Sequence, residues 1–176
     1  MTHTPSAVNP LVRIPLGFEA EFPGASAVAT EAFLNVGVLT GAVRSAVERL
    51  VTEAGSPSMA AFNVLSVLDG DPAPLRPSTI AARMLVTRAT ITGVLDVLER
   101  RRLVRRRPSG DDGRSKEVVI TVAGRRLVQD LVPRVHRFER ELMGALSDDQ
   151  LHQLTSMVAV LQQRIAELDP RARFGV

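Results

Sequence analysis

The segment from Ser78 to Thr121 constrains the fold most, because it predicts two short helices, a tight turn and a hairpin in immediate succession. Ser78 can cap a first helix over about 79–84, and Thr87 can cap a second helix, TRATITGVLDVLERR. Apolar side chains recur every three or four residues along this second helix, at Ile91, Val94, Leu95 and Leu98. The opposite face is polar and basic, with Arg88, Thr92, Asp96 and Arg100. This order predicts a helix-turn-helix.

Two stretches with strand character follow the second helix, at 103–107 and 117–121. The sequence between them, PSGDDGRS, consists of turn-forming residues. A hairpin directly after such a helix indicates a wing. Side chains alternate along a strand, so Arg105 and Arg107 share one face and Arg106 lies on the other.

Positive charge is concentrated in this region. Six arginines fall within positions 100–107, and the stretch from Glu99 to Lys116 holds eight basic and three acidic residues. Its local charge of +5 exceeds the +3 of the whole chain, so the remainder carries −2. A local basic patch of this kind predicts an anionic partner. We expect the arginines at 100–102 to pair with Glu99 or to lie in solvent.

Long helices are predicted on both sides of this core. An apolar seam over 28–54 steps by three and four up to Gly55, through Ala32, Val36, Leu39, Val43, Ala46 and Leu50. Ser56 is then the expected N-cap of a new helix, with Pro57 as its first residue and Gly70 after its last turn. Phe62, Leu65 and Leu68 are its expected buried stripe.

Thr121 is expected to cap a long helix that runs to about Ala145. Ser147 and Gln150 then have the spacing of a capping box. The last helix carries a second narrow seam, at Leu151, Leu154, Val158, Leu161, Ile165 and Leu168. Seams of this width are usually covered by another helix.

These patterns divide the chain into three parts. Residues 56–145 form a winged helix-turn-helix domain with its long connecting helix, and residues 28–55 and 146–170 form a helical dimerisation region. Residues 1–27, with four prolines, predict an extended arm whose apolar side chains pack on the body or on a partner subunit. We expect the two ends of two subunits to interleave into a homodimer. An intrachain helix pair in a monomer is the alternative.

The composition argues against several classes of function. The chain has no cysteine, which excludes disulfides, thiol catalysis and cysteine metal sites. The common hydrolase, nucleotide-binding and zinc motifs do not occur. We therefore expect no enzyme activity, no cofactor and no metal. Without a signal sequence or a long apolar run, the expectation is a cytoplasmic protein without membrane contact.

The stretch LRPSTIAARMLVTRATITGVLDVLERRRLVRRRPSGDDGRSKEVVITVAGRRLV resembles the winged-helix core of the MarR (multiple antibiotic resistance regulator) transcription factors. The likeness lies in the recognition segment and in the wing. The recognition segment carries Thr87, Thr90, Thr92, Asp96, Leu98 and Glu99, and the wing carries the Asp112-Gly113-Arg114 motif. It implies a mainly α fold with a small β-hairpin wing. It also implies a homodimeric regulator, usually a repressor, that leaves a pseudo-palindromic operator when a small aromatic or lipophilic effector binds. The chain departs from the family at Arg102 and Leu85, where glycine is common, and a left-handed backbone at Arg102 would carry a cost.

For double-stranded DNA, the residues expected to make contact come from the second helix and the wing. Thr87 and Thr90 suit phosphate, Arg88 suits guanine, Thr92 suits a base edge, and Gly93 allows close approach. In the wing, Arg114 suits the minor groove, and Ser109 and Lys116 suit the backbone. Asp112 is expected to hold Arg114 or another arginine in place.

A dimeric winged-helix adaptor that binds protein, without sequence-specific DNA binding, is the competing hypothesis. A regulator should bind even nonspecific duplex at low salt, whereas an adaptor need not.

Overall fold

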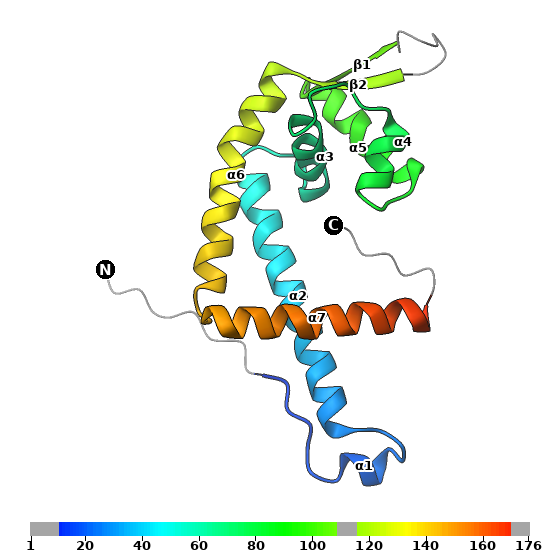
Figure 1. Ribbon diagram of the computed structural model, residues 1–176, viewed down its shortest axis with the longest axis vertical. Coiled ribbons are helices and arrows are strands. Elements are labelled where there is room, and N and C mark those ends of the chain that lie inside the picture. Colours follow the sequence, from blue (N-terminus) through cyan, green and yellow to red (C-terminus); the bar gives the residue numbers. More distant parts are fainter. Residues whose placement is uncertain (1–10, 109–115, 170–176) are drawn as a thin grey trace, which may run out of the picture. The chain divides into compact units, whose positions relative to one another are not determined.

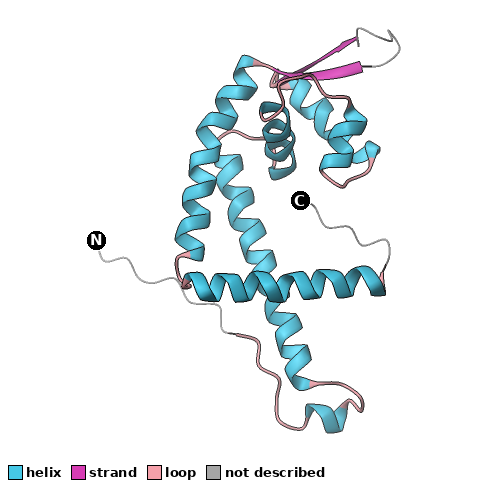
Figure 2. Ribbon diagram, in the orientation of Figure 1, coloured by secondary structure: helices cyan, strands magenta, loops and turns pink. Residues whose placement is uncertain are grey.

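The computed structural model describes residues 11–108 and 116–169 (Figures 1 and 2). In this part the chain is mainly helical with one antiparallel hairpin, as predicted. The elements in chain order are α1 (Phe18–Glu21), α2 (Ala27–Glu53), α3 (Met59–Asp69), α4 (Pro77–Arg83), α5 (Arg88–Arg100), β1 (Val104–Pro108), β2 (Lys116–Ile120), α6 (Val122–Met143) and α7 (Asp148–Leu168). The chain divides into two compact units, Met1–Val47 and Glu48–Val176.

The core of the second unit is built from α3, α4, α5, both strands and α6. The predicted stripe of α3 is buried at Phe62, Leu65 and Leu68. The predicted stripe of α5 is buried at Ile91, Leu95 and Leu98. Burial of one such side chain contributes about 1.5–3 kcal/mol, so the apolar faces of these helices fix how the helix-turn-helix sits on its support.

The two strands form an antiparallel hairpin in which Val104 pairs with Ile120 and Pro108 with Lys116. Leu75, before α4, adds a short bridge to this sheet, because its amide and carbonyl both bond to Val118, at 3.2 and 2.8 Å. The wing is thereby joined to the segment that leads into the helix-turn-helix. Each strand lies one residue away from its predicted position, because the amide of Leu103 bonds to Leu98 at the end of α5 and Thr121 caps α6.

Three helices end in the same backbone motif. The second residue after the helix is left-handed, at Gly55, Leu85 and Arg102 (φ +100°, +52° and +58°). In each case the next amide bonds back to a carbonyl five residues earlier, as Ser56 does to Val51, Val86 to Ala81 and Leu103 to Leu98. This is the Schellman motif, which favours glycine at the left-handed position. Leucine and arginine therefore hold that position at two of the three ends, including the turn of the helix-turn-helix.

The prediction that Ser56 caps α3 is wrong. The amide of Ser56 completes the end of α2, and its buried hydroxyl donates to the carbonyl of Ser58. Ser58 is the N-cap instead, since its hydroxyl accepts from the amide of Ala61 at 3.1 Å.

The start of α4 also differs from the prediction. The helix begins at Pro77, and Ser78 lies inside it. Proline suits the first helical position because it has no amide proton and its φ is already helical.

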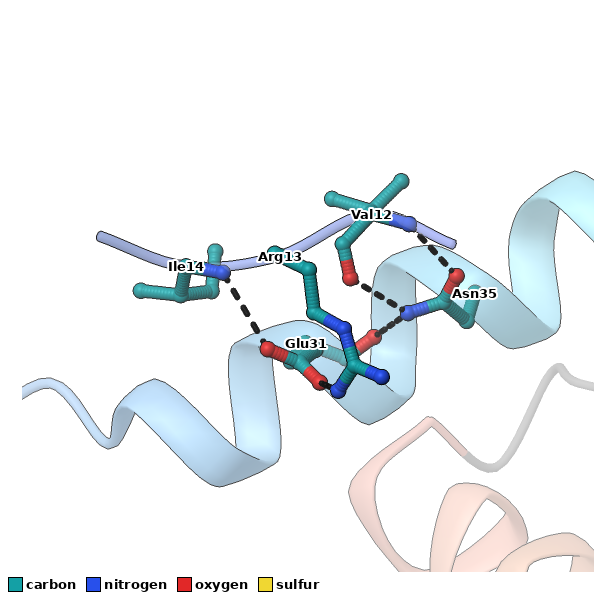
Figure 3. A network of polar contacts seen from close by, with 5 residues as sticks. All are labelled: Val12, Arg13, Ile14, Glu31 and Asn35. Atoms are coloured by element: carbon teal, nitrogen blue, oxygen red, sulfur yellow. Dashed lines mark hydrogen bonds and ion pairs between the residues drawn. The ribbon is translucent and has the colours of Figure 1, made fainter. Parts of the chain in front are cut away.

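In the first unit, the arm lies along the beginning of α2 (Figure 3). The Asn35 side chain holds the backbone of Val12 at both its amide (2.9 Å) and its carbonyl (3.0 Å). Glu31 accepts from the amide of Ile14 at 3.1 Å and from Arg13 at 2.7 Å. The prediction of an extended arm over 1–27 misses α1, a single turn whose first residue, Phe18, has its ring 5.1 Å from the ring of the C-capping residue, Phe22.

The two last helices begin where the sequence predicts. Thr121 caps α6 by accepting from the amide of Gly124, and Ser147 and Gln150 form the predicted capping box of α7. No described residue of α7 is buried, and its apolar seam is exposed from Leu154 onward, with Leu161 at 58%. Among the described residues, no helix is both long and apolar enough to cross a membrane.

Candidate nucleic-acid interface

Helix α5 presents its polar face to solvent because its apolar face belongs to the core. Arg88, Thr90, Thr92 and Gly93 are exposed, as is the capping residue Thr87. These five sequence-predicted residues are therefore all accessible to solvent, and they lie at the cap and in the first two turns of the helix. The first amides of a helix and its dipole favour an anion at that end.

The hydroxyls of Thr87 and Thr90 are bonded to each other. The Thr87 oxygen accepts from the amide of Thr90 at 3.2 Å, and the two side-chain oxygens lie 2.9 Å apart. A single O–H···O bond uses one of the two hydroxyl protons, whichever residue donates. The pair therefore keeps one proton for an acceptor such as a phosphate oxygen.

Arg88 is exposed and forms no ion pair with any residue in the described ranges. Its guanidinium is thus available for the bidentate contact that arginine makes with guanine or phosphate. At Gly93, a side-chain carbon built on the backbone would meet nothing within 4 Å. The packing of the chain itself does not require glycine there.

The wing contributes fewer described residues. Lys116 is exposed at the start of β2 and faces Pro108 across the hairpin. Ser109, Asp112 and Arg114 lie outside the described residues.

Arg106 connects the wing to α5, and the sequence did not identify this role. Its guanidinium lies 2.6 Å from Asp96 and 2.8 Å from Glu99, and its backbone amide donates to Glu99 at 3.0 Å. Burial disfavours the charge on Arg106, but the bonds and charges of the two carboxylates outweigh burial and raise its pKa above the usual value. Glu99 therefore binds Arg106, and Arg100, Arg101 and Arg102 lie exposed. The available signal was the i, i+3 spacing of Asp96 and Glu99, opposite the strand face of Arg106.

A second ion pair holds the loop before α4. Asp71 accepts from the amide of Ala73 at 3.0 Å and lies 2.7 Å from the guanidinium of Arg83. These contacts, the amide first and then Arg83, lower the pKa of Asp71. The loop is therefore fixed at the end of the first helix of the helix-turn-helix. Within the described ranges, no group of three or more His, Asp or Glu side chains is placed to hold a metal ion.

Residues 56–115, which contain this surface, match the model of the MarR family. The chain is also 31% identical over 106 residues to the HTH-type transcriptional repressor YetL of Bacillus subtilis, covering 60% of this chain and 64% of that protein. These matches support a MarR-family winged helix over residues 56–115. The chain spans about half to two thirds of the length of the curated MarR-type relatives that it matches.

Solved MarR-type structures share the fold. The match to SP03579, a MarR family transcription regulator, covers 82% of this chain and 94% of that protein, with a TM-score of 0.72 and 19% identity. The match to MepR in the Staphylococcus aureus MepR–DNA complex covers 74% of this chain and 94% of MepR, with a TM-score of 0.67 and 19% identity. The match to PcaV of Streptomyces coelicolor, solved in complex with its natural ligand, covers 82% of this chain and 97% of PcaV, with a TM-score of 0.63 and 24% identity. At these identities the likeness establishes the winged-helix fold of this chain and no more.

Proposed function

We propose that this protein is a homodimeric DNA-binding transcriptional regulator, a repressor that a small aromatic or lipophilic effector releases from a pseudo-palindromic operator. The observation that carries the proposal is the exposed start of α5. There, Arg88 has no ion-pair partner among the described residues, and Thr87 and Thr90 keep a free hydroxyl proton. The fold is that of a protein solved as a DNA complex, MepR. Arg88 is the expected guanine contact, Thr87, Thr90 and Lys116 the expected phosphate contacts, and Arg114 the expected minor-groove contact.

The DNA-binding part is tested by fluorescence anisotropy with a duplex from the region upstream of the protein's own coding sequence. Affinity should fall steeply between 50 and 200 mM salt, because bound arginines release counterions from the duplex, by a factor on the order of a thousand or more if six or more phosphates are contacted. Arg88→Ala should reduce the preference for this duplex over a scrambled one by about 5- to 150-fold. Arg114→Ala should weaken binding to both duplexes.

Arg126→Ala is the matched control, because Arg126 is also exposed but lies on α6. It should leave the preference for the upstream duplex unchanged. A protein that binds neither this duplex nor nonspecific duplex at low salt contradicts the proposal and favours the protein-binding adaptor.

The homodimer rests on the exposed apolar seams. On α7, Leu154, Leu161 and Ile165 lie at least partly in solvent, and on α2 so do Val36 and Leu39. Contiguous apolar surface of this kind usually marks an interface. Leu161→Glu should halve the mass measured by sedimentation equilibrium, whereas Gln163→Glu, on the other side of α7, should not. An unchanged mass for Leu161→Glu, or a monomeric wild type, contradicts the homodimer.

Effector release is supported by the family and by the ligand complex of the similarly folded PcaV. The test adds a panel of aromatic acids and lipophilic antibiotics to the preformed protein–duplex complex. At least one compound should raise the apparent dissociation constant for the operator about tenfold or more, within the usual range of allosteric coupling. A panel without effect on any operator contradicts this part alone.

A further inference from the structure

The hydroxyl proton of Thr92 is already used inside α5. Thr92 lies on the exposed face, one helical turn after Arg88, and its side-chain oxygen donates to the Arg88 carbonyl at 2.9 Å. Serine and threonine often make this bond to the carbonyl four residues earlier in a helix. In this position the side chain is fixed in one rotamer.

This bond decides what Thr92 can offer to a partner. A hydroxyl has one proton and two acceptor lone pairs. With the proton used, the side chain presents its methyl group and an acceptor, and no donor. The Thr87 and Thr90 pair differs, since there one hydroxyl proton remains free.

The base pairs of DNA differ in how well they match these groups. In the major groove, thymine presents a methyl and adenine an amino donor, so an A·T pair matches both the methyl and the acceptor of Thr92. Guanine presents only acceptors there, and Thr92 has no proton to give them. Cytosine offers an amino group but no methyl.

We infer that Thr92 is a specificity-determining residue that reads an A·T base pair, with its methyl against the methyl of thymine. This inference rests on the proposed function, because it requires α5 to enter the major groove. Under this inference, Arg88 and Thr92, which lie one turn apart on α5, each recognise a different base pair of the operator. Arg88 donates to guanine, and Thr92 selects thymine.

The test removes one methyl group at a time from each side of the contact. The preferred duplex is first selected from a randomised library with the full chain, and each thymine is then replaced in turn by deoxyuridine, which lacks only that methyl. At one thymine in each half-site, the wild type should lose about fourfold in affinity, as expected for one buried methyl. Thr92→Val, which keeps a methyl, should show the same ratio. Thr92→Ser, which keeps the hydroxyl and loses the methyl, should show none.

Two results overturn the inference while leaving the proposed function intact. One is specific binding in which the wild type and Thr92→Ser respond equally to deoxyuridine at every position. The other is a preference for guanine that Thr92→Ser retains and Thr92→Val loses, because that pattern requires a donated proton. Absence of binding to any duplex overturns the proposed function itself. Thermal melting of each variant shows that the fold is retained.

Discussion

The Arg106 guanidinium on β1 lies 2.6 Å from the Asp96 carboxylate on α5. The same guanidinium also reaches Glu99, so two acidic groups on the helix are held by one cation on the wing. Two consequences follow for the candidate interface. The wing and α5 are fixed to each other, and one of the two negative charges that would repel phosphate is compensated by the single positive charge of Arg106.

Replacing Arg106 should therefore cost more than replacing its neighbour. Arg106→Gln leaves Asp96 and Glu99 without their cation, and we expect a loss of about 1–3 kcal/mol in the free energy of unfolding, as for bonds to charged groups. Arg107→Gln removes a longer pair with Glu117, at 3.4 Å, in which the arginine side chain is 48% exposed, against 21% for Arg106, and it should cost less than about 1 kcal/mol. Urea denaturation measures both. Equal losses in the two variants would contradict the role of Arg106 as the connection between wing and helix.

The left-handed residues Leu85 and Arg102 predict that glycine stabilises the fold at both positions. A left-handed conformation costs a non-glycine residue about 1–2 kcal/mol, and glycine in return loses about 0.5–1 kcal/mol of backbone entropy. We therefore expect Leu85→Gly and Arg102→Gly each to raise the free energy of unfolding, by about 0.5–1 kcal/mol. Arg126→Gly, in the second turn of α6, should lower it by about 1 kcal/mol. Thermal or urea unfolding distinguishes these signs, and destabilisation by all three glycines would refute the strain.

Gly124 and Gly93 should respond oppositely to alanine. A side-chain carbon on Gly124 would lie 2.2 Å from the Leu103 carbonyl oxygen, which already accepts bonds from the amide and hydroxyl of Thr121. Gly124→Ala should destabilise by about 1–3 kcal/mol or more, since backbone must move. Gly93→Ala meets no atom and should stabilise α5 by up to about 1 kcal/mol, while weakening DNA binding if the duplex approaches there. Unfolding curves of the two variants, with binding measured for Gly93→Ala, check both expectations.

The helix and hairpin patterns in the sequence predict most elements of the fold. The periodicity of Ile91, Leu95 and Leu98 predicts the buried face of α5, because burial on one side of a helix needs only local spacing. Thr87, Thr121 and Ser147 are predicted as caps for the same reason, since a cap acts within one turn.

The errors occur where one residue has two possible roles. Ser56 has the features of a cap, but its amide is needed to end α2, and the choice depends on how the chain turns at Gly55. Alternation along the strand predicts that Arg106 faces away from Arg105 and Arg107, yet its ion-pair partners depend on how the hairpin folds back on α5. The spacing of Asp96 and Glu99 places two carboxylates on one helix face, but it does not specify which arginine they bind.

The contact between the arm and α2 should depend on pH through Glu31. The amide of Ile14, and then Arg13, stabilise the ionised carboxylate and lower its pKa from 4.5. A group with a lowered pKa in the folded state contributes its stabilisation above the unfolded value and loses it as pH falls through the folded value. The Ile14 amide should therefore shift in NMR spectra with a midpoint below 4.5. The Val12 amide, held by Asn35, which does not titrate, is the internal control and should respond less. In Glu31→Gln the Ile14 titration should vanish, and a midpoint at or above 4.5 in the wild type would show that the contact in Figure 3 does not persist in solution.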